Sequence, residues 1–120
     1  MGLNSVMQTV ARCLFVFLLV FALFSGLKSQ PMPQVVPHFD LLLHFGAFAL
    51  LMGLWVVGFA RPLLGVAVLI AIGLGIELWQ GLLLPARTAD ERDILANISG
   101  VFSGWLAMVV LRRSAWLRMG

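Results

Sequence analysis

Few side chains in this sequence can do chemistry, and most of them occur in pairs at helical spacing. The pairs are Asp40 with His44, Glu77 with Gln80, and Asp93 with Asn97. Residues three or four positions apart lie on one face of an α-helix, so each pair presents two polar groups together. A histidine near carboxylates can act as a general acid or base. If these pairs form a site, the helices that carry them must bring them to one place.

The composition places those helices in a membrane. Of the 120 residues, 62% are hydrophobic and 11% are charged, whereas soluble domains carry about 25% charged residues. A water-soluble fold of this length could not bury so much apolar surface, so lipid is the expected solvent. The net charge is +3, but the basic residues are scattered. They form no basic patch with interleaved aromatic residues, so no nucleic-acid partner is expected.

Uncharged stretches long enough to cross a bilayer predict four helices. A transmembrane helix needs roughly 20 apolar residues. We expect an all-α integral membrane protein, a bundle of four transmembrane helices at residues 7–27, 41–60, 62–84 and 93–111. Residues 1–39 would hold the first helix and a proline-rich outer loop. Residues 40–120 would form a three-helix core with a basic cytoplasmic tail.

Prolines mark the ends of these helices. Pro31, Pro33 and Pro37 predict an extended loop, because proline disfavours a regular helix at and just before its own position. Pro62 suits the first position of the third helix, and Pro85 ends that helix. The first apolar stretch has a second interpretation, a cleaved signal peptide, but no good small-residue cleavage site follows it. We therefore expect a retained helix.

The arginines indicate the orientation. With four spans, the N-terminus, the turn at residue 61 and the C-terminus share one side of the membrane. Five arginines belong to that side: Arg12, Arg61, Arg112, Arg113 and Arg118. The opposite side holds Lys28, Arg87 and Arg92. Because basic residues near helix ends stay in the cytoplasm, we expect both termini to be cytoplasmic, in a bacterial inner membrane. Arg12 is expected to extend its guanidinium to that interface.

In this topology the polar pairs converge near the outer surface, but each residue also has a purely structural explanation. His44 could pack between helices, and Asn97 could join helices through a hydrogen bond worth about 0.6 kcal/mol. Asp93 could favour the N-terminus of its helix. Glu77 is harder to explain, because a central acid costs roughly 2.5–3.5 kcal/mol to insert. Spacing alone leaves a functional site and a structural polar cluster equally open.

Signals for a metal or a cofactor are weak. His44, Glu77 and Asp93 are residue types that can hold a metal ion, but no ligand spacing supports such a site, so neither a metal nor a cofactor is expected. The sequence contains no phosphate loop, zinc-protease helix or nucleophile elbow. Small residues on the fourth helix are expected to let helices pack closely. They are Ala96, Gly100, Gly104 and Ala107.

Taken together, the motifs DLLLHF at 40–45, ELWQ at 77–80, PAR at 85–87 and DILANISG at 93–100 resemble those of the VanZ-like family. These small membrane proteins are named after a protein associated with low-level resistance to the lipoglycopeptide teicoplanin. The resemblance covers residues 40–111. It implies ligand-binding positions at Asp40, His44, Glu77, Gln80, Arg87, Asp93 and Asn97. Two positions depart from the family pattern. Leu41 replaces a frequent lysine and Ala86 a frequent glycine, so anion binding would depend more on Arg87.

The resemblance is compatible with three classes of function. In the first, a polar pocket in the outer leaflet binds a lipid head group or a lipoglycopeptide-type amphiphile, with Arg87 pairing with its phosphate or carboxylate. In the second, the protein is an enzyme that modifies lipid-linked head groups, with His44, Glu77 and Asp93 as catalytic candidates. Either Asp40 or Asp93 would hold His44. In the third, it is a small accessory subunit of a larger membrane complex. Helix–helix association with itself or with another membrane protein is a separate expectation from the small-residue faces. We favour the first, because the sequence contains no evident nucleophile.

Overall fold

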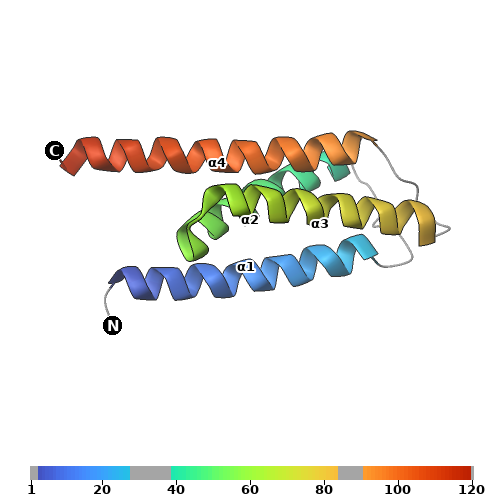
Figure 1. Ribbon diagram of the computed structural model, residues 1–120, viewed down its shortest axis with the longest axis horizontal. Coiled ribbons are helices and arrows are strands. Elements are labelled where there is room, and N and C mark those ends of the chain that lie inside the picture. The colour runs from blue at the N-terminus through green and yellow to red at the C-terminus, as the bar shows by residue number, and fades with distance from the viewer. Residues whose placement is uncertain (1–2, 28–38, 84–90, 120) are drawn as a thin grey trace.

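The chain folds into four α-helices, as predicted from the uncharged stretches. The computed structural model describes residues 3–27, 39–83 and 91–119. Its helices are α1 at Leu3–Leu27, α2 at Phe39–Phe59, α3 at Pro62–Leu83 and α4 at Glu91–Met119, and the described residues contain no strand (Figure 1). The predicted proline-rich loop and Pro85 lie outside the described residues. The fold class is therefore confirmed for the part that the structure describes.

All four helices can cross a bilayer. Their apolar spans are 22, 19, 22 and 23 residues long, at Asn4–Ser25, Leu41–Phe59, Pro62–Leu83 and Arg92–Ser114. Large hydrophobic side chains cover the outside of every helix, and Phe17 (74% exposed), Leu63 (71%) and Leu82 (78%) are among the most exposed. Water-soluble monomeric proteins rarely expose a continuous apolar surface of this extent. The protein is therefore a multi-pass membrane protein whose outer surface faces lipid.

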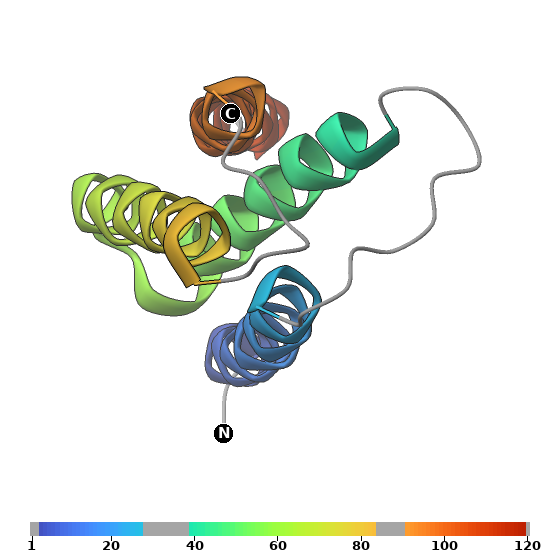
Figure 2. The same ribbon diagram turned by 90° about the vertical axis from the view of Figure 1, so that its right-hand side faces the viewer.

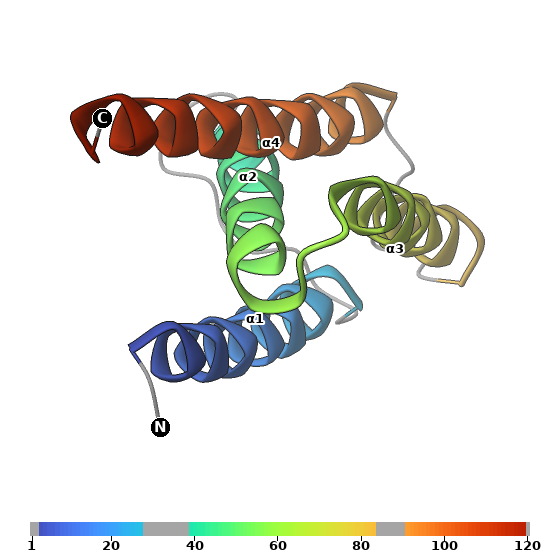
Figure 3. The ribbon, with the colours of Figure 1, turned by 60° about the vertical axis from the view of Figure 1, so that its left-hand side comes forward.

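The helices run alternately up and down, so that the two described chain ends lie at one end of the bundle (Figure 1). Helix α2 lies between α1 and α4 with its axis inclined to both (Figures 2 and 3). Helix α3 lies to the side of α2 and packs along α4. The end that holds the α2–α3 turn is called the turn end here, and the opposite end is called the polar end. The start of α4 therefore lies at the polar end, beside the start of α2 and the last turns of α3.

Glycines let α2 and α4 approach each other backbone to backbone. A Cβ atom on Gly100 would collide with the carbonyl oxygen of Phe45, and one on Gly104 would collide with that of Ala49. Both collisions involve backbone, which cannot rotate out of the way as a side chain can. The prediction that small residues let the helices pack closely is therefore confirmed at Gly100 and Gly104. Close helix pairs in membranes commonly use such residues. Ala107 departs from the prediction, because it is exposed.

Helix α4 is longer than predicted. It ends at Met119, whereas hydropathy placed its end at Leu111, followed by a basic tail. At 1.5 Å per residue its 29 residues span about 43 Å, more than the roughly 30 Å of a hydrocarbon core. The prediction was wrong because the first charges after an apolar stretch mark the membrane boundary and not the end of the helix. The residues from 112 to 119 contain no proline or glycine.

Two arginines satisfy carbonyl groups at the C-terminus of α2, which lies at the turn end. The Arg12 Nε donates to the Gly58 carbonyl at 2.6 Å, and an Arg112 nitrogen donates to the Val56 carbonyl at 3.4 Å. The last carbonyls of a helix have no partner within the helix, and in lipid they must find one elsewhere. Arg12 also lies over the Phe59 ring, 5.5 Å from its centroid. The structure therefore gives Arg12 a role in packing α1 on α2, beyond the predicted reach toward the interface.

The connection between α2 and α3 is a tight turn. Ala60 and Arg61 both have positive φ, at 57° and 45°, and Pro62 then begins α3 as predicted. The Trp55 indole donates to the Arg61 carbonyl at 3.1 Å. The ring lies so close to Gly65 that any Cβ there would collide with it. These contacts hold two L-residues in a left-handed conformation that costs roughly 1–2 kcal/mol each.

The apolar core fills the middle of the bundle and extends to the turn end. Its buried residues come from all four helices, and they include Phe15, Met52, Leu69 and Val101. The Phe15 ring meets those of Trp55 and Phe59 edge-on, at centroid distances of 5.6 and 5.5 Å. This aromatic contact attaches α1 to α2. The division of the chain at residue 39 into an outer helix and a three-helix core stays a prediction.

We predict that Gly104→Val separates α2 from α4 and destabilises the bundle. The added side chain meets backbone, so the expected loss is at least the roughly 1–3 kcal/mol of an overpacked core. The measurement is reversible unfolding in mixed micelles. Ala107→Val is the matched control, because it adds two carbons at an exposed position of the same helix. Equal stability of the two variants would contradict the close α2–α4 contact.

Candidate functional site

Four buried or half-buried polar side chains meet at the polar end of the bundle. We call His44, Glu77, Asp93 and Asn97 the polar cluster. They come from three helices: His44 is five residues after the start of α2, Asp93 and Asn97 are in the first two turns of α4, and Glu77 is six residues before the end of α3. Six residues correspond to about 9 Å along a helix axis. The cluster therefore lies below the helix ends and beyond the apolar core.

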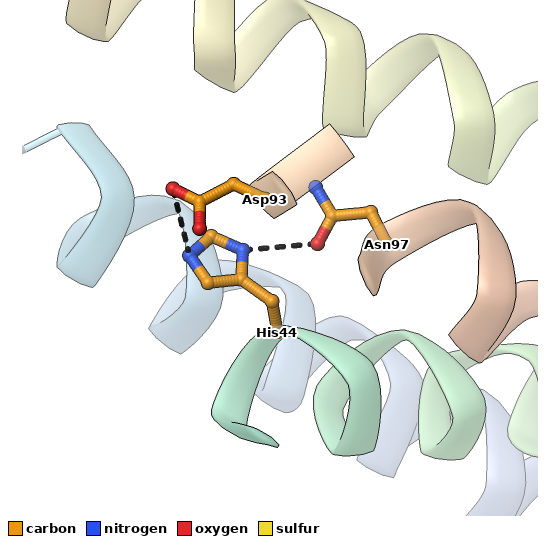
Figure 4. Close-up of polar contacts among 3 residues, drawn as sticks. All are labelled: His44, Asp93 and Asn97. Carbon is orange, nitrogen blue, oxygen red and sulfur yellow. Dashed lines mark hydrogen bonds and ion pairs between the residues drawn. The ribbon is translucent and has the colours of Figure 1, made fainter. Parts of the chain in front are cut away.

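Asn97 sets the orientation of the His44 ring. The Nδ1 atom of His44 lies 2.9 Å from the Asn97 Oδ1 atom (Figure 4). Because an amide oxygen only accepts hydrogen bonds, this contact requires the proton on Nδ1. The neutral ring then has an unprotonated Nε2 with a lone pair. Asn97 thus selects the tautomer of His44 as well as its position.

Asp93 faces the other nitrogen of the same ring. Its Oδ2 atom lies 3.9 Å from the His44 Nε2 atom (Figure 4). This distance allows an ion pair when the ring is protonated, but it exceeds the 2.7–3.2 Å of a hydrogen bond. The two α4 residues are four positions apart, so they lie one above the other on the face of α4 that meets α2. His44 therefore inserts between two side chains of the neighbouring helix.

Glu77 is the most deeply buried acid in the described part of the chain, with 2% of its surface exposed. One carboxylate oxygen of Glu77, one of Asp93 and a ring nitrogen of His44 all lie within 4.8 Å of one another. Gln80 is on the same face of α3 and is also buried, with 3% exposed. Burying an acid at this depth costs free energy, so a role in helix packing alone explains Glu77 less well than the other members of the cluster.

Gly73 makes the space that Asn97 occupies. A Cβ atom on Gly73 would lie 3.0 Å from the Asn97 Nδ2 atom and 3.4 Å from its Cβ atom. Asn97 is 2% exposed, and its Nδ2 atom has no hydrogen-bond partner among the described residues. One amide group therefore fills the gap between α3 and α4 while its oxygen holds the ring on α2. The two hydrogens of Nδ2 are available to an acceptor that enters the cluster.

The structure brings together four of the predicted site residues. His44, Glu77, Asp93 and Asn97 converge as their helical spacing indicated, and Gln80 is buried beside Glu77. Asp40 belongs to the first turn of α2, but its side chain lies outside the described part, and so does Arg87 entirely. Sequence reasoning left the partner of His44 open between Asp40 and Asp93. Spacing within one helix carries no information about contacts between helices, so this choice needed the fold.

Comparisons of this chain with known proteins identify no relative. No family model matches the chain, and neither the curated proteins nor the solved structures that were searched contain a similar protein. The VanZ-like resemblance therefore stays a prediction from the motifs at 40–45, 77–80, 85–87 and 93–100.

We predict that His44 and Asn97 are energetically coupled. A double-mutant cycle with His44→Ala and Asn97→Ala should give a coupling energy between about 0.6 and 1.7 kcal/mol, the average and the maximum measured for hydrogen bonds between membrane helices. The measurement is unfolding in mixed micelles. A parallel cycle with Leu43→Ala is the control, since Leu43 is 50% exposed and directly precedes His44. Equal coupling in the two cycles would rule out the specific bond.

Proposed function

We propose that this protein is a VanZ-like protein of the bacterial cell envelope that binds the head group of a membrane amphiphile at its polar cluster. The observation that carries the proposal is the position of His44. It contacts two α4 residues, Asp93, whose side chain is 11% exposed, and Asn97, which is buried, while its own side chain is 22% exposed. The cluster therefore has one member that a molecule in the membrane can reach and three that are enclosed behind it.

The enclosed groups favour particular head-group chemistry. Glu77 and Asp93 accept hydrogen bonds when ionised, and the Asn97 Nδ2 atom donates them. An amine or a hydroxyl on the ligand would suit the two acids, and an oxygen acceptor would suit Asn97. Arg87 would add a cation for a phosphate or carboxylate of the same ligand. Lipid head groups and lipoglycopeptides combine such groups with an acyl chain, and that chain would lie against the exposed leucines beside His44.

We place the polar end at the outer face of a bacterial inner membrane, with both termini in the cytoplasm. The support is the distribution of basic residues. Arg12, Arg61 and Arg112 are near the turn end of the bundle, where they accompany the described chain ends. Basic residues near helix ends stay in the cytoplasm. In this orientation the polar cluster meets amphiphiles of the outer leaflet and drugs that arrive from outside, which accords with a role in teicoplanin tolerance.

We predict that the purified protein carries a bound amphiphile that depends on the cluster. Native mass spectrometry of protein released from nanodiscs of bacterial lipid should show an adduct on the wild type. Changes in the cluster should reduce it by steps, to about a tenth in Glu77→Gln or Asn97→Leu, because each removes one contact of about 1.4 kcal/mol, which is tenfold in affinity. Ser103→Ala, at an exposed position of α4, is the control. An adduct of equal intensity in every variant would exclude the cluster as its site.

An enzyme that modifies lipid-linked head groups is the second candidate. It is favoured by the arrangement in which Asn97 fixes the His44 tautomer while Asp93 faces Nε2, since a general base needs a ring held in one orientation. His44 would take a proton from a substrate hydroxyl or a water. Glu77 would return a proton to the leaving group. Arg87 would stabilise the developing negative charge.

We predict that lipid profiles separate the two candidates. Cells would carry wild type, Glu77→Gln, His44→Ala or no copy, and the three proteins would be compared at matched membrane levels. Binding alone should leave the envelope lipids and lipid-linked precursors identical in all four strains, with drug susceptibility changing by degrees. A species present only with wild type would establish catalysis and identify the substrate. It would also overturn the binding function as the whole activity.

A further inference from the structure

We propose that His44, Glu77 and Asp93 bind a divalent transition-metal ion, with Zn²⁺ as the best match. This inference goes beyond the proposed function and does not depend on it, because the ion would bind in the absence of any amphiphile. Neither the spacing of these residues in the sequence nor any comparison with known proteins assigns a metal to this chain. The assignment comes from the three-helix arrangement at the polar end.

The first support is the geometry of the donor atoms. One ring nitrogen of His44 and one oxygen each of Glu77 and Asp93 lie within 4.8 Å of one another. The His44 Nε2 and Asp93 Oδ2 atoms are 3.9 Å apart. In a tetrahedral zinc site with arms of about 2.0–2.2 Å, donor atoms are about 3.4 Å apart. Small side-chain rotations would therefore close the described arrangement onto one ion without moving the helices.

The second support is the tautomer of His44. Its Nδ1–H donates to the Asn97 oxygen at 2.9 Å, so the Nε2 lone pair faces the Asp93 carboxylate. Two acceptors that face each other across 3.9 Å are stabilised by a cation between them. Metal-binding histidines almost always donate their other N–H to a carbonyl or carboxylate, which fixes the ring and makes the metal-facing nitrogen more basic. Asn97 would be that outer partner.

The third support is the remaining donor on Asn97. Its Nδ2 atom is buried and has no hydrogen-bond partner among the described residues. Three protein ligands leave a fourth position of a zinc ion open to water or to a ligand oxygen. The oxygen at this open position would accept a hydrogen bond from Nδ2, which has no other acceptor among the described residues. Asn97 would thus position the ring through Oδ1 and serve the open position through Nδ2.

The donor set also limits the choice of ion. Imidazole nitrogen favours Zn²⁺ and other transition metals, whereas Mg²⁺ and Ca²⁺ favour six or more oxygen ligands. One nitrogen and two carboxylate oxygens therefore fit Zn²⁺, and Co²⁺ or Mn²⁺ after it, better than Mg²⁺ or Ca²⁺. A charge of +2 on the ion balances the two carboxylates. The ion would also present an open coordination position to a phosphate oxygen of a head group.

Zinc binding to the full-length protein in nanodiscs tests the proposal. The affinity tag must contain no histidine, and Cys13→Ser removes the one exposed thiol as a competing ligand. After treatment with a chelator, the protein would be equilibrated with Zn²⁺ in excess Mg²⁺. Its metal content and its affinity against a competing chelator would then be measured. We expect one Zn²⁺ per chain, with His44→Ala, Glu77→Gln and Asp93→Asn each weakening binding at least 100-fold.

Two further variants distinguish a specific metal site from adventitious metal binding. Asn97→Leu should weaken Zn²⁺ binding by 10–100-fold while leaving the stoichiometry at one, as expected for an outer partner of the ligand. His38→Ala removes the only other histidine of the chain and should have no effect. Zinc that is lost with His38 but kept in the three ligand variants would overturn the proposal.

A spectroscopic measurement on the wild type keeps the test decisive if the ligand variants fail to fold. Co²⁺ in place of Zn²⁺ should give the intense visible bands of a four-coordinate ion. X-ray absorption at the zinc edge should show one imidazole and oxygen ligands in the first shell. No bound metal, or a shell of water oxygens only, would overturn the site. It would not contradict the binding of an amphiphile, which is tested separately by native mass spectrometry and can be repeated in a buffer without metal.

Discussion

The backbones of α2 and α4 touch at Gly100 and Gly104, and the geometry of the polar cluster depends on that contact. A Cβ atom at either glycine would collide with a carbonyl oxygen of α2. Asn97 is one turn before Gly100, and His44 directly precedes Phe45, whose carbonyl meets Gly100. The close contact therefore brings a ring on α2 within 2.9 Å of an amide on α4. With a larger separation, the short Asn97 side chain could not reach the ring.

The two ends of the bundle satisfy their polar groups in different ways. A polar group in lipid must find its partner within the protein. At the turn end, Arg12 and Arg112 reach carbonyls of α2, and Trp55 reaches that of Arg61. At the polar end, side chains of three helices gather around His44 instead. The first set consists of hydrogen bonds to backbone carbonyls, whereas the second set consists of contacts between side chains.

The two proposals for the polar end fit together chemically, although each can fail alone. A metal ion held by Glu77, Asp93 and His44 would have an open coordination position beside the Asn97 amide, and a phosphate oxygen of a head group could take it. The same ion would polarise a bound phosphoryl group, which is the chemistry that the enzymatic alternative requires. Knowing whether a metal binds therefore bears on both candidate functions.

The sequence by itself determined the solvent, the number of helices and the identity of the polar groups. Long uncharged stretches can only be helices in lipid, and spacing of three or four residues placed Glu77, Asp93, Asn97 and His44 on definite helix faces. It misjudged the end of α4, because hydropathy reports where a helix leaves the membrane and not where it stops. Tertiary structure alone decided that His44 meets Asn97 and Asp93, and that Glu77 comes within reach of a shared ion. These contacts join different helices, and they follow from how closely the backbones approach, which no periodicity along one chain encodes.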